Sequence, residues 1–367
     1  QIPMSSHPAP SAAWPGVIRR YARFLPVTAE TPVVTLLEGN TPLIPVPQFV
    51  AAIGGNFDLR LKYEAMNPTC SFKDRGMVVA VAKAAESGAR AIVCASTGNT
   101  SASAAAYAAA AGIQSVVLVP EGKIALGKLS QAVAHKAQIL QVQGNFDDCL
   151  DLSRGLADNY PVHLVNSVNP DRIEGQKTAA FEVVERLDRA PDIHVLPVGN
   201  AGNYSAYFKG YLEEFNRGII KTVPKMWGFQ ADGSAPFVYG TPVKNPDTIA
   251  TAIRIGNPAS YELALSAREC SLGMFGSVTD AEILWMHRFL SQEVGVFVEP
   301  SSATGAAGLL TQSRAGEVPA DSVIVVTVTG HGLKDPMWAL KTESGEEIVP
   351  TIVPNNAAEV AERLGLA

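Results

Sequence analysis

The sequence predicts an α/β fold, in which open, twisted and mainly parallel sheet is covered by helices on both faces. Three observations predict this fold. Strand-like and helix-like segments alternate through the middle of the chain, the strand-like segments are short apolar runs, and the turns between them are short and rich in Gly, Asn, Ser and Thr. Parallel strands need a crossover between them, so this alternation favours a parallel sheet. A chain of 367 residues is also long for one hydrophobic core, so we expect two domains.

The predicted elements begin with a helix over 17–23, a Gly-Asn-Thr-Pro turn, a strand over 59–64 and a helix over 77–86. A regular alternation follows, and its five strands each lead into a helix. The strands are 91–95, 115–119, 138–142, 163–165 and 193–197, and their helices end at residues 111, 136, 159, 187 and 216.

Beyond residue 230 the alternation becomes less regular. A Gly- and Pro-rich loop with one short helix is predicted over 231–257, because these residues interrupt regular structure. The elements predicted after it are helices from Ala259 and Thr279, a short strand near Phe297, a helix from Ser301, a strand over 323–328 and a helix in the tail.

Composition excludes several classes of function. A net charge of -6 without a basic patch argues against a nucleic-acid partner, and no apolar run reaches the roughly 18 residues of a membrane span. The first fifteen residues lack the pattern of a secretion signal, and the four cysteines have no spacing typical of a disulfide framework or zinc site. The histidines show no ligand spacing either, so we expect no metal, reduced thiols and a cytoplasmic location.

The segment Asn67–Gly76 holds the most informative lysine of the chain. It lies between a predicted strand and a predicted helix, at the edge of the sheet where open α/β folds bind ligands. Ser71 has the residue type of a helix N-cap, which places Lys73 in the first helical turn. The helix dipole and Arg75 are expected to lower the pKa of Lys73 and make its amine a better nucleophile. The alternative is an ordinary surface lysine.

Three further turns have the composition of anion sites, since such turns present backbone N–H groups at helix N-termini. Gly199–Asn203 is the best candidate for a phosphate, and Ser96–Thr100 suits a carboxylate. Asn166 and Ser167 combine with Arg172, whose guanidinium suits a phosphate. The alternatives are an ordinary strand-to-helix turn, a set of helix caps, and a loop with a surface salt bridge.

The stretch Gly122–Lys128 fits the nucleotide pattern G-x-x-x-x-G-K. The pattern requires Ser or Thr next, to hold magnesium, and Leu129 stands there instead. We therefore do not expect an ATP or GTP site, although Lys123 can still face an anion.

Taken together, these segments resemble the fold-type II pyridoxal-phosphate enzymes, and within them the threonine synthase family. The resemblance extends from Trp14 to Lys341. It is carried by four segments: Asn67–Gly76, in which Asp-Arg-Gly follows Lys73; Gly199–Asn203; Val165–Glu182; and the Thr-Gly-His-Gly-Leu-Lys-Asp-Pro run from Thr329.

The resemblance implies a fold and a role for each turn. The fold would have two open, mainly parallel sheets with the active site between a large domain, 1–64 plus 169–367, and a small mobile domain, 65–168. Lys73 would bind pyridoxal 5'-phosphate as a Schiff base and then act as the mobile acid and base. The other expected cofactor contacts are Asn99 at the ring hydroxyl, Gly199, Asn200, Ala201, Gly202, Asn203 and Tyr204 at the phosphate, and Thr329 at the ring nitrogen. The expected substrate contacts are Ser96, Thr97 and Thr100 at the carboxylate, and Lys123, Asn166, Ser167 and Arg172 at the substrate phosphate.

The implied reaction is the conversion of O-phospho-L-homoserine and water to L-threonine and phosphate, in a homodimer. The alternatives are a threonine dehydratase-like lyase and a non-catalytic regulator that binds the cofactor or an amino acid. Thr329 is neutral, so the cofactor ring should be a milder electron sink than one held by a carboxylate. Cys70 departs from the family pattern, in which a small residue is usual. We expect thiol reagents to inhibit through it, with protection by cofactor or substrate.

Overall fold

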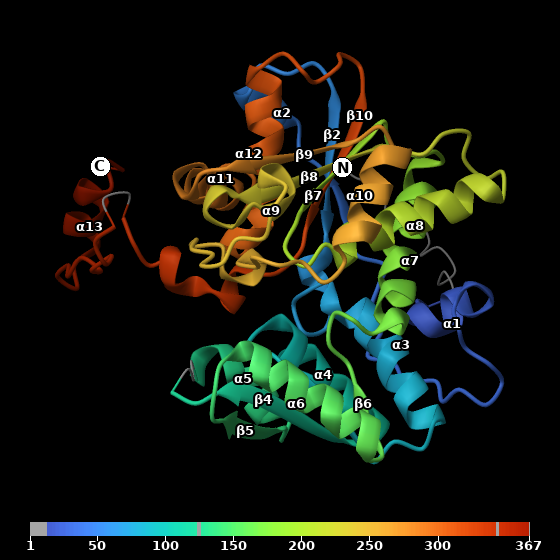
Figure 1. Ribbon diagram of the computed structural model, residues 1–367. Helices are drawn as coiled ribbons and strands as arrows, with labels where there is room; N and C mark the ends of the chain where they lie inside the picture. Colours follow the sequence, from blue (N-terminus) through green and yellow to red (C-terminus); the bar gives the residue numbers. More distant parts are fainter. Residues whose placement is uncertain (1–12, 123–125, 343–344, 367) are drawn as a thin grey trace, which may run out of the picture. The chain divides into compact units, whose positions relative to one another are not determined.

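The computed structural model describes residues 13–122, 126–342 and 345–366 (Figure 1). The chain divides into two compact units, Gln1–Asp335 and Pro336–Ala367. The second unit contains the helix α13 (Ala357–Arg363) and a bridge between Lys341 and Glu347. All the predicted site residues belong to the first unit.

The first unit contains a six-stranded sheet with the order β1-β2-β10-β7-β8-β9. Its strands are β1 (Leu43–Pro45), β2 (Asp58–Tyr63), β7 (Ile193–Pro197), β8 (Lys225–Ala231), β9 (Met274–Val278) and β10 (Val323–Val328). Only the edge strand β1 is antiparallel to its neighbour among the described strands, and the other pairs are parallel. The carboxyl ends of the parallel strands therefore meet at one edge.

Helices cover both faces of this sheet (Figure 1). Successive residues of a strand face opposite sides, and β10 shows this directly. Ile324 and Val326 lie in one buried apolar cluster with helices α2, α11 and α12, whereas Val325 lies in another with α7, α8 and α10. The bounds of these helices are Pro47–Ala52 for α2, Asp280–Gln292 for α11, Pro300–Arg314 for α12, Pro170–Leu187 for α7, Gly202–Asn216 for α8 and Tyr261–Cys270 for α10.

A second, four-stranded parallel sheet has the order β5-β4-β3-β6. Its strands are β3 (Ala91–Ala95), β4 (Gln114–Pro120), β5 (Gln138–Val142) and β6 (Val162–Leu164). Helices α3 (Lys73–Glu86), α4 (Asn99–Ala111) and α5 (Leu126–Ala134) contribute to the apolar cluster that holds Ile92 and Cys94, while α6 (Phe146–Asn159) packs on the face of Val93. The strands of this sheet all lie within the predicted small domain, 65–168.

The predicted fold class is confirmed, and the strands predicted at 91–95, 138–142, 193–197 and 323–328 have the bounds that the structure gives them. The prediction near Phe297 is wrong, because Val298 forms only an isolated bridge with His331. Strands β8 and β9 were not predicted. Strand β9 is the partly exposed edge of the sheet and contains a glycine, Gly276, so it lacks the apolar run of an inner strand. The short helix of the 231–257 loop is α9 (Pro236–Tyr239).

Candidate active site

Lys73 is held at the carboxyl end of β10 by a short antiparallel pairing between two loops. The backbone N–H of Phe72 donates to the oxygen of Thr329 at 2.9 Å, and the N–H of His331 donates to the oxygen of Cys70 at 3.0 Å. Helix α3 begins at Lys73, so the predicted first-turn position is confirmed. The N-cap position is Phe72, one residue after the predicted Ser71, but the Ser71 hydroxyl still accepts from the backbone N–H of Lys73 at 3.4 Å.

The two charged residues after Lys73 anchor this loop. Asp74 accepts hydrogen bonds from the hydroxyls of Thr69 at 2.5 Å and Ser103 at 2.6 Å. Burial raises the pKa of Asp74 to about 6 against the effect of these hydrogen bonds. The guanidinium of Arg75 is buried between the carboxylates of Glu64 and Glu182, with contacts of 2.7 and 2.6 Å. Arg75 therefore fixes helix α3 to α7 and to the end of β2 rather than facing Lys73.

Gly76 allows helices α3 and α7 to cross at close range. A Cβ atom on Gly76 would lie 2.6 Å from the backbone oxygen of Arg172, and one on Gly175 would lie 2.0 Å from the backbone oxygen of Arg75. Real Cβ atoms do not approach backbone oxygen so closely, so larger residues would push the helices apart. The close crossing brings the start of α7, and with it Arg172, beside the lysine.

The amine of Lys73 lies in surroundings that favour its neutral form. Its pKa is lowered to about 7, first by burial of the amine and then by the positive charge of Arg172, while the carboxylate of Glu299 opposes this shift. The expectation that the pKa is lowered is confirmed. Its expected cause was wrong in part, because the neighbouring cation is Arg172 and the charge of Arg75 is neutralised by its own carboxylate partners. The Lys73 Nζ lies 4.4 Å from the centre of the Phe72 ring.

Glu299 is a member of the site that sequence reasoning missed. It is buried at the N-cap of α12, and its Oε1 accepts from the Nδ2 of Asn99 at 3.0 Å. Burial raises the pKa of Glu299 to about 7, while Lys334, Asn99 and Lys73 oppose that shift. A glutamate before a proline at a helix start carries no local signal of this role. Only the folded structure shows that it joins α4 to the end of β10.

The turn Gly199–Asn203 forms an uncapped helix start. The N-cap of α8 is Ala201, with a φ of 64°, and alanine has no side-chain oxygen to accept from the first amides of the helix. A Cβ on Gly202 would meet only the hydroxyl of Ser260, at 3.6 Å, so the approach to these amides is open. The Nδ2 of Asn203 is buried without a partner among the described residues. These donors suit an anion.

Arg172 is buried and forms no ion pair with any described residue. Its Nη1 donates to the oxygen of Val165 at 3.2 Å, and its Nε has no partner in the described part of the chain. Burial lowers the pKa of Arg172 to about 10. The alternative of a surface salt bridge is therefore wrong for this residue. A buried guanidinium without a counter-ion is suited to an anionic ligand.

Asn200 and Ser167 lie together in the structure, whereas the side chain of Asn166 is used to hold its own loop. The Nδ2 of Asn200 donates to the hydroxyl of Ser167 at 3.2 Å, which joins the two predicted anion turns. The side chain of Asn166 instead pairs with the backbone N–H and oxygen of Ala95, both at 3.0 Å. Asn166 therefore holds the loop in place, with its amide already used by the protein. Lys123 lies outside the described residues.

The turn Ser96–Thr100 follows β3 and opens helix α4. The hydroxyl of Ser96 accepts from the N–H of Gly98 at 3.2 Å, so it shapes the turn. Thr97 and Thr100 are half-buried, and their hydroxyls make no hydrogen bond to a described residue. This leaves hydroxyl groups on the same turn as Asn99 for a ligand.

Tyr204 and Cys70 make contacts that the sequence did not indicate. The Tyr204 side chain points into the core, where its hydroxyl donates to the oxygen of Met226 at 2.9 Å, so only its backbone belongs to the anion turn. Cys70 has a φ of 65°, a left-handed conformation that residues with a side chain rarely adopt, and its thiol is free and half-buried. The preference for a small residue here therefore has a backbone cause.

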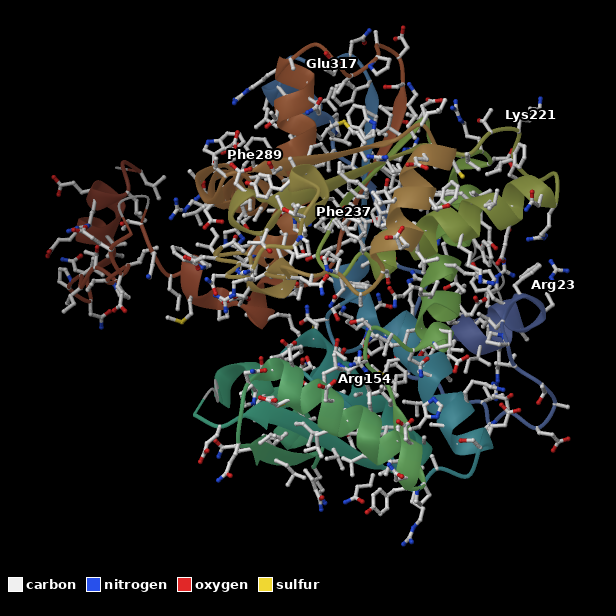
Figure 2. The ribbon with its side chains drawn as sticks, viewed as in Figure 1. Arg23, Arg154, Lys221, Phe237, Phe289 and Glu317 are labelled. Carbon is white, nitrogen blue, oxygen red and sulfur yellow. The ribbon has the colours of Figure 1, made fainter. Side chains whose placement is uncertain are left out.

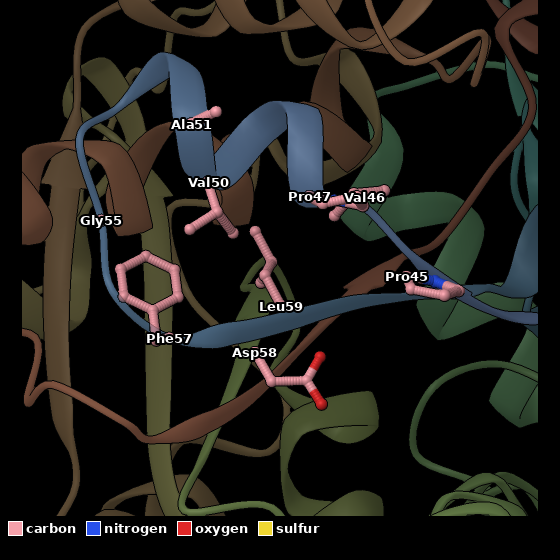
Figure 3. A pocket seen from close by; sticks show the side chains of 9 residues that line it. All are labelled: Pro45, Val46, Pro47, Val50, Ala51, Gly55, Phe57, Asp58 and Leu59. Carbon is pink, nitrogen blue, oxygen red and sulfur yellow. The ribbon is translucent and has the colours of Figure 1, made fainter.

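A shallow hollow of about 390 Å³ lies between α2 and β2, lined mainly by apolar side chains (Figure 3). None of the predicted site residues lines it. The described residues also contain no group of histidine, cysteine and acidic side chains placed to hold a metal ion. No described helix is long and apolar enough to cross a membrane.

Comparison of this chain with known proteins shows first its enzyme class and then its family. The family model described as "Pyridoxal-phosphate dependent enzyme" matches residues 34–330, so fold and site define an enzyme of this class. The chain is 53% identical over 342 residues to a threonine synthase of Synechocystis, covering 93% of this chain and 89% of that protein. It is 55% identical over 357 residues to a threonine synthase of Mycobacterium tuberculosis, covering 96% and 97%. The chain therefore belongs to the threonine synthase family of pyridoxal-phosphate dependent lyases.

A solved structure supports the fold independently. Threonine deaminase isoform 2 of Solanum lycopersicum superimposes with a TM-score of 0.71, at 18% identity, over 86% of this chain and 84% of that one. At this identity the likeness concerns the fold alone.

The residues at the site fit pyridoxal 5'-phosphate. The cofactor carries a phosphate, an aldehyde, a ring hydroxyl and a ring nitrogen. The uncapped start of α8 offers amides for an anion, and Lys73 offers an amine whose pKa of about 7 leaves much of it neutral near neutral pH. Asn99, at the start of α4, supplies a neutral amide, and Thr329, directly after β10, supplies a neutral hydroxyl.

Proposed function

We propose that this chain converts O-phospho-L-homoserine and water to L-threonine and phosphate, with Lys73 as the catalytic residue. The observation that carries the proposal is Arg172, a buried guanidinium with no ion pair among the described residues, close enough to Lys73 to lower the pKa of its amine. A buried cation without a counter-ion is costly unless a ligand supplies the negative charge. A substrate with a phosphate group supplies it, whereas threonine does not.

In this proposal the chain holds the substrate at its two charged ends. Arg172, Ser167 and Asn200 bind the phosphate together with Lys123, and Asn166 supports that side of the pocket by holding its loop to Ala95. Ser96, Thr97 and Thr100 bind the carboxylate through hydroxyls and the backbone amides of the turn. Binding at both ends fixes the direction of the carbon–hydrogen bond that must break, so binding energy far from the reacting atoms lowers the barrier.

The cofactor is held by the Gly199–Tyr204 backbone, with Asn99 at its ring hydroxyl and Thr329 at its ring nitrogen. When bound, it withdraws electrons from the substrate carbon and acidifies the neighbouring hydrogens. Lys73 moves the protons in turn. Its neutral Nζ removes the proton from Cα and passes it to an oxygen of the substrate phosphate, and it then removes a proton from Cβ as the phosphate leaves Cγ. Nζ gives this second proton to Cγ, which becomes the methyl carbon; water then adds its hydroxyl to Cβ, and the remaining proton of that water reaches Cα through Nζ. A pKa of about 7 suits an amine that must both take and give protons near neutral pH.

We also propose that residues 65–168 move as a small domain against 1–64 plus 169–367, closing on the substrate and excluding water until the phosphate has left. The two sheets support this division, since β3, β4, β5 and β6 all lie within 65–168 and the strands of the six-stranded sheet all lie outside it. The hydrogen bonds from Asn99 to Glu299 and from Asn200 to Ser167 cross the proposed boundary and would have to break when the site opens. The resemblance supports a homodimer and a cytoplasmic location as parts of the same proposal.

The test is to incubate the purified protein with pyridoxal 5'-phosphate and O-phospho-L-homoserine, and to measure threonine and phosphate. We expect both products in equal amounts. The Arg172→Gln variant should lose most of this activity while still binding the cofactor. Release of phosphate without threonine would contradict the proposal.

Two rival functions give different results in the same assays. A threonine dehydratase-like lyase would deaminate threonine as its main activity, and Arg172→Gln would leave that activity largely intact. A non-catalytic regulator would be yellow, and borohydride would trap the cofactor on Lys73, yet no substrate would turn over.

A further inference from the structure

Ser260 stands immediately before helix α10 and next to the turn Gly199–Asn203. Its backbone N–H donates to the oxygen of Asn200 at 3.1 Å, and the N–H of Ala259 donates to the Oδ1 of Asn200, also at 3.1 Å. The Nδ2 of Asn200 donates to Ser167, so the Asn200 amide is held at both ends. These hydrogen bonds fix the start of α10 beside the start of α8.

The hydroxyl of Ser260 is buried and makes no hydrogen bond to any described residue. Ser260 is 6% exposed and occupies the N-cap position of α10, where a serine ordinarily accepts from the first amides of its own helix. It does not do so here, because its φ of -108° and ψ of 36° are not the extended backbone of a capping serine. A buried hydroxyl without a partner is costly, so it calls for a partner outside α10.

This hydroxyl faces the open start of α8. A Cβ built on Gly202 would lie 3.6 Å from the Ser260 Oγ and, outside the adjoining chain, would meet nothing else within 4 Å. The backbone amides of Gly202, Asn203 and Tyr204 donate to no described residue. The unused hydroxyl at the start of one helix therefore lies over the unused amides at the start of another.

We propose that the Ser260 hydroxyl donates a hydrogen bond to the cofactor phosphate, so that the starts of α8 and α10 bind this group together. The inference rests on the proposed function, in which the Gly199–Tyr204 backbone holds the phosphate. A phosphate group presents three acceptor oxygens, so it has room for a side-chain donor in addition to the amides. A hydrogen bond to an ionised acceptor is also stronger than one between neutral groups. In this role Ser260 sets the affinity for the phosphorylated cofactor and takes no part in the proton transfers.

The test compares pyridoxal 5'-phosphate with pyridoxal, which has the same ring and aldehyde but no phosphate. The dissociation constant of the full-length apo-protein is measured for each by absorbance. Ser260→Ala should weaken the binding of pyridoxal 5'-phosphate by about tenfold or more, because a hydrogen bond to a charged group is lost, and should leave the binding of pyridoxal unchanged. The matched control is Ser271→Ala at the other end of α10, where the hydroxyl is already hydrogen-bonded to the backbone of Met226 and Arg268. It should leave both dissociation constants unchanged.

Equal weakening of both ligands would show that Ser260 supports the shape of the site and does not bind phosphate, and this result would overturn the inference. Unchanged binding of pyridoxal 5'-phosphate by Ser260→Ala would overturn it too. If Ser260→Ala does not fold, a crystal structure of the unsubstituted protein with its cofactor decides the matter. We expect the Ser260 Oγ about 2.6–3.0 Å from a phosphate oxygen, and a separation of more than about 3.5 Å from all of them overturns the inference.

Failure of the proposed function is visible separately in the unsubstituted protein. Borohydride would then leave no cofactor mass on Lys73, or O-phospho-L-homoserine would give no threonine. Neither result depends on Ser260, so the two proposals fail in different measurements.

Discussion

The protonation of Lys73 is set by three groups from different parts of the chain. Burial lowers the pKa of its amine most, Arg172 at the start of α7 lowers it further, and Glu299 at the start of α12 raises it. The two charges act in opposite directions, so replacing each should have an opposite and measurable effect. The sequence indicated the lysine, because a local motif surrounds it, but neither Glu299 nor the buried state of Arg172 has a local signature.

Neutralising Glu299 should shift the pH dependence of cofactor uptake to lower pH. In Glu299→Gln the carboxylate that favours the charged amine is gone, so the pKa of Lys73 falls below about 7. Only the neutral amine attacks the aldehyde, so uptake should persist to lower pH, by about one pH unit. The measurement is the rate at which the apo-protein binds pyridoxal 5'-phosphate, followed by absorbance over a range of pH.

Arg172→Gln is the matched control, and it should shift the pKa of Lys73 in the opposite direction. It removes a positive charge that disfavours the charged amine, so the pKa of Lys73 should rise and uptake should fail at a higher pH than in the unsubstituted protein. If both variants shift the profile in the same direction, the electrostatic account of the site is wrong.

At the scale of elements, the site depends on how closely α3 and α7 cross. Lys73 begins one helix and Arg172 lies in the first turn of the other, so the distance between the helices sets the distance between the two cations. The Arg75 guanidinium holds the helices together through Glu182, and Gly76 and Gly175 leave room for the contact. Arg75 and Gly76, which follow Lys73 in the Asp-Arg-Gly sequence, therefore fix the position of Lys73 and do not take part in its chemistry.

Gly76→Ala should destabilise the protein by about 1–3 kcal/mol, because its Cβ would lie 2.6 Å from the backbone oxygen of Arg172. The control is Gly155→Ala in the middle of α6, where an added Cβ meets nothing within 4 Å. That substitution should stabilise the protein by about 0.5–1 kcal/mol, because alanine loses less backbone entropy than glycine in a helix. Denaturant unfolding of the two variants checks both signs, and equal effects would show that the crossing tolerates a wider spacing.

At the scale of the whole molecule, sequence reasoning succeeded where the information is local. Apolar runs and polar turns gave the alternation of strands and helices, and the loop motifs gave the residues that gather at the carboxyl ends of β3, β7 and β10. The missing parts depend on contacts distant in sequence. The pairs Asn99–Glu299 and Ser302–Thr329, and the cluster of Arg75 with Glu64 and Glu182, join segments that only the fold brings together.

If residues 65–168 move as proposed, the distance between the two domains should change, and a distance within the large domain should not. Arg154 on α6 lies in the proposed small domain, and Glu317 and Lys221 lie in the proposed large domain; all three are exposed and are labelled in Figure 2. Spin labels on cysteines at 154 and 317 report the distance between the domains, in a protein whose half-buried Cys70 is replaced by alanine and whose exposed Cys270 is replaced by serine. With cofactor and a non-reactive phosphonate analogue of the substrate, we expect this distance to shorten by more than about 2 Å, because Arg172, Ser167 and Asn200 then share one anion across the boundary. Labels at 221 and 317, both in the proposed large domain, should keep their distance. If the distance between the labels at 154 and 317 also stays the same, residues 65–168 do not move as a domain. Water must then be excluded by the loops of the site.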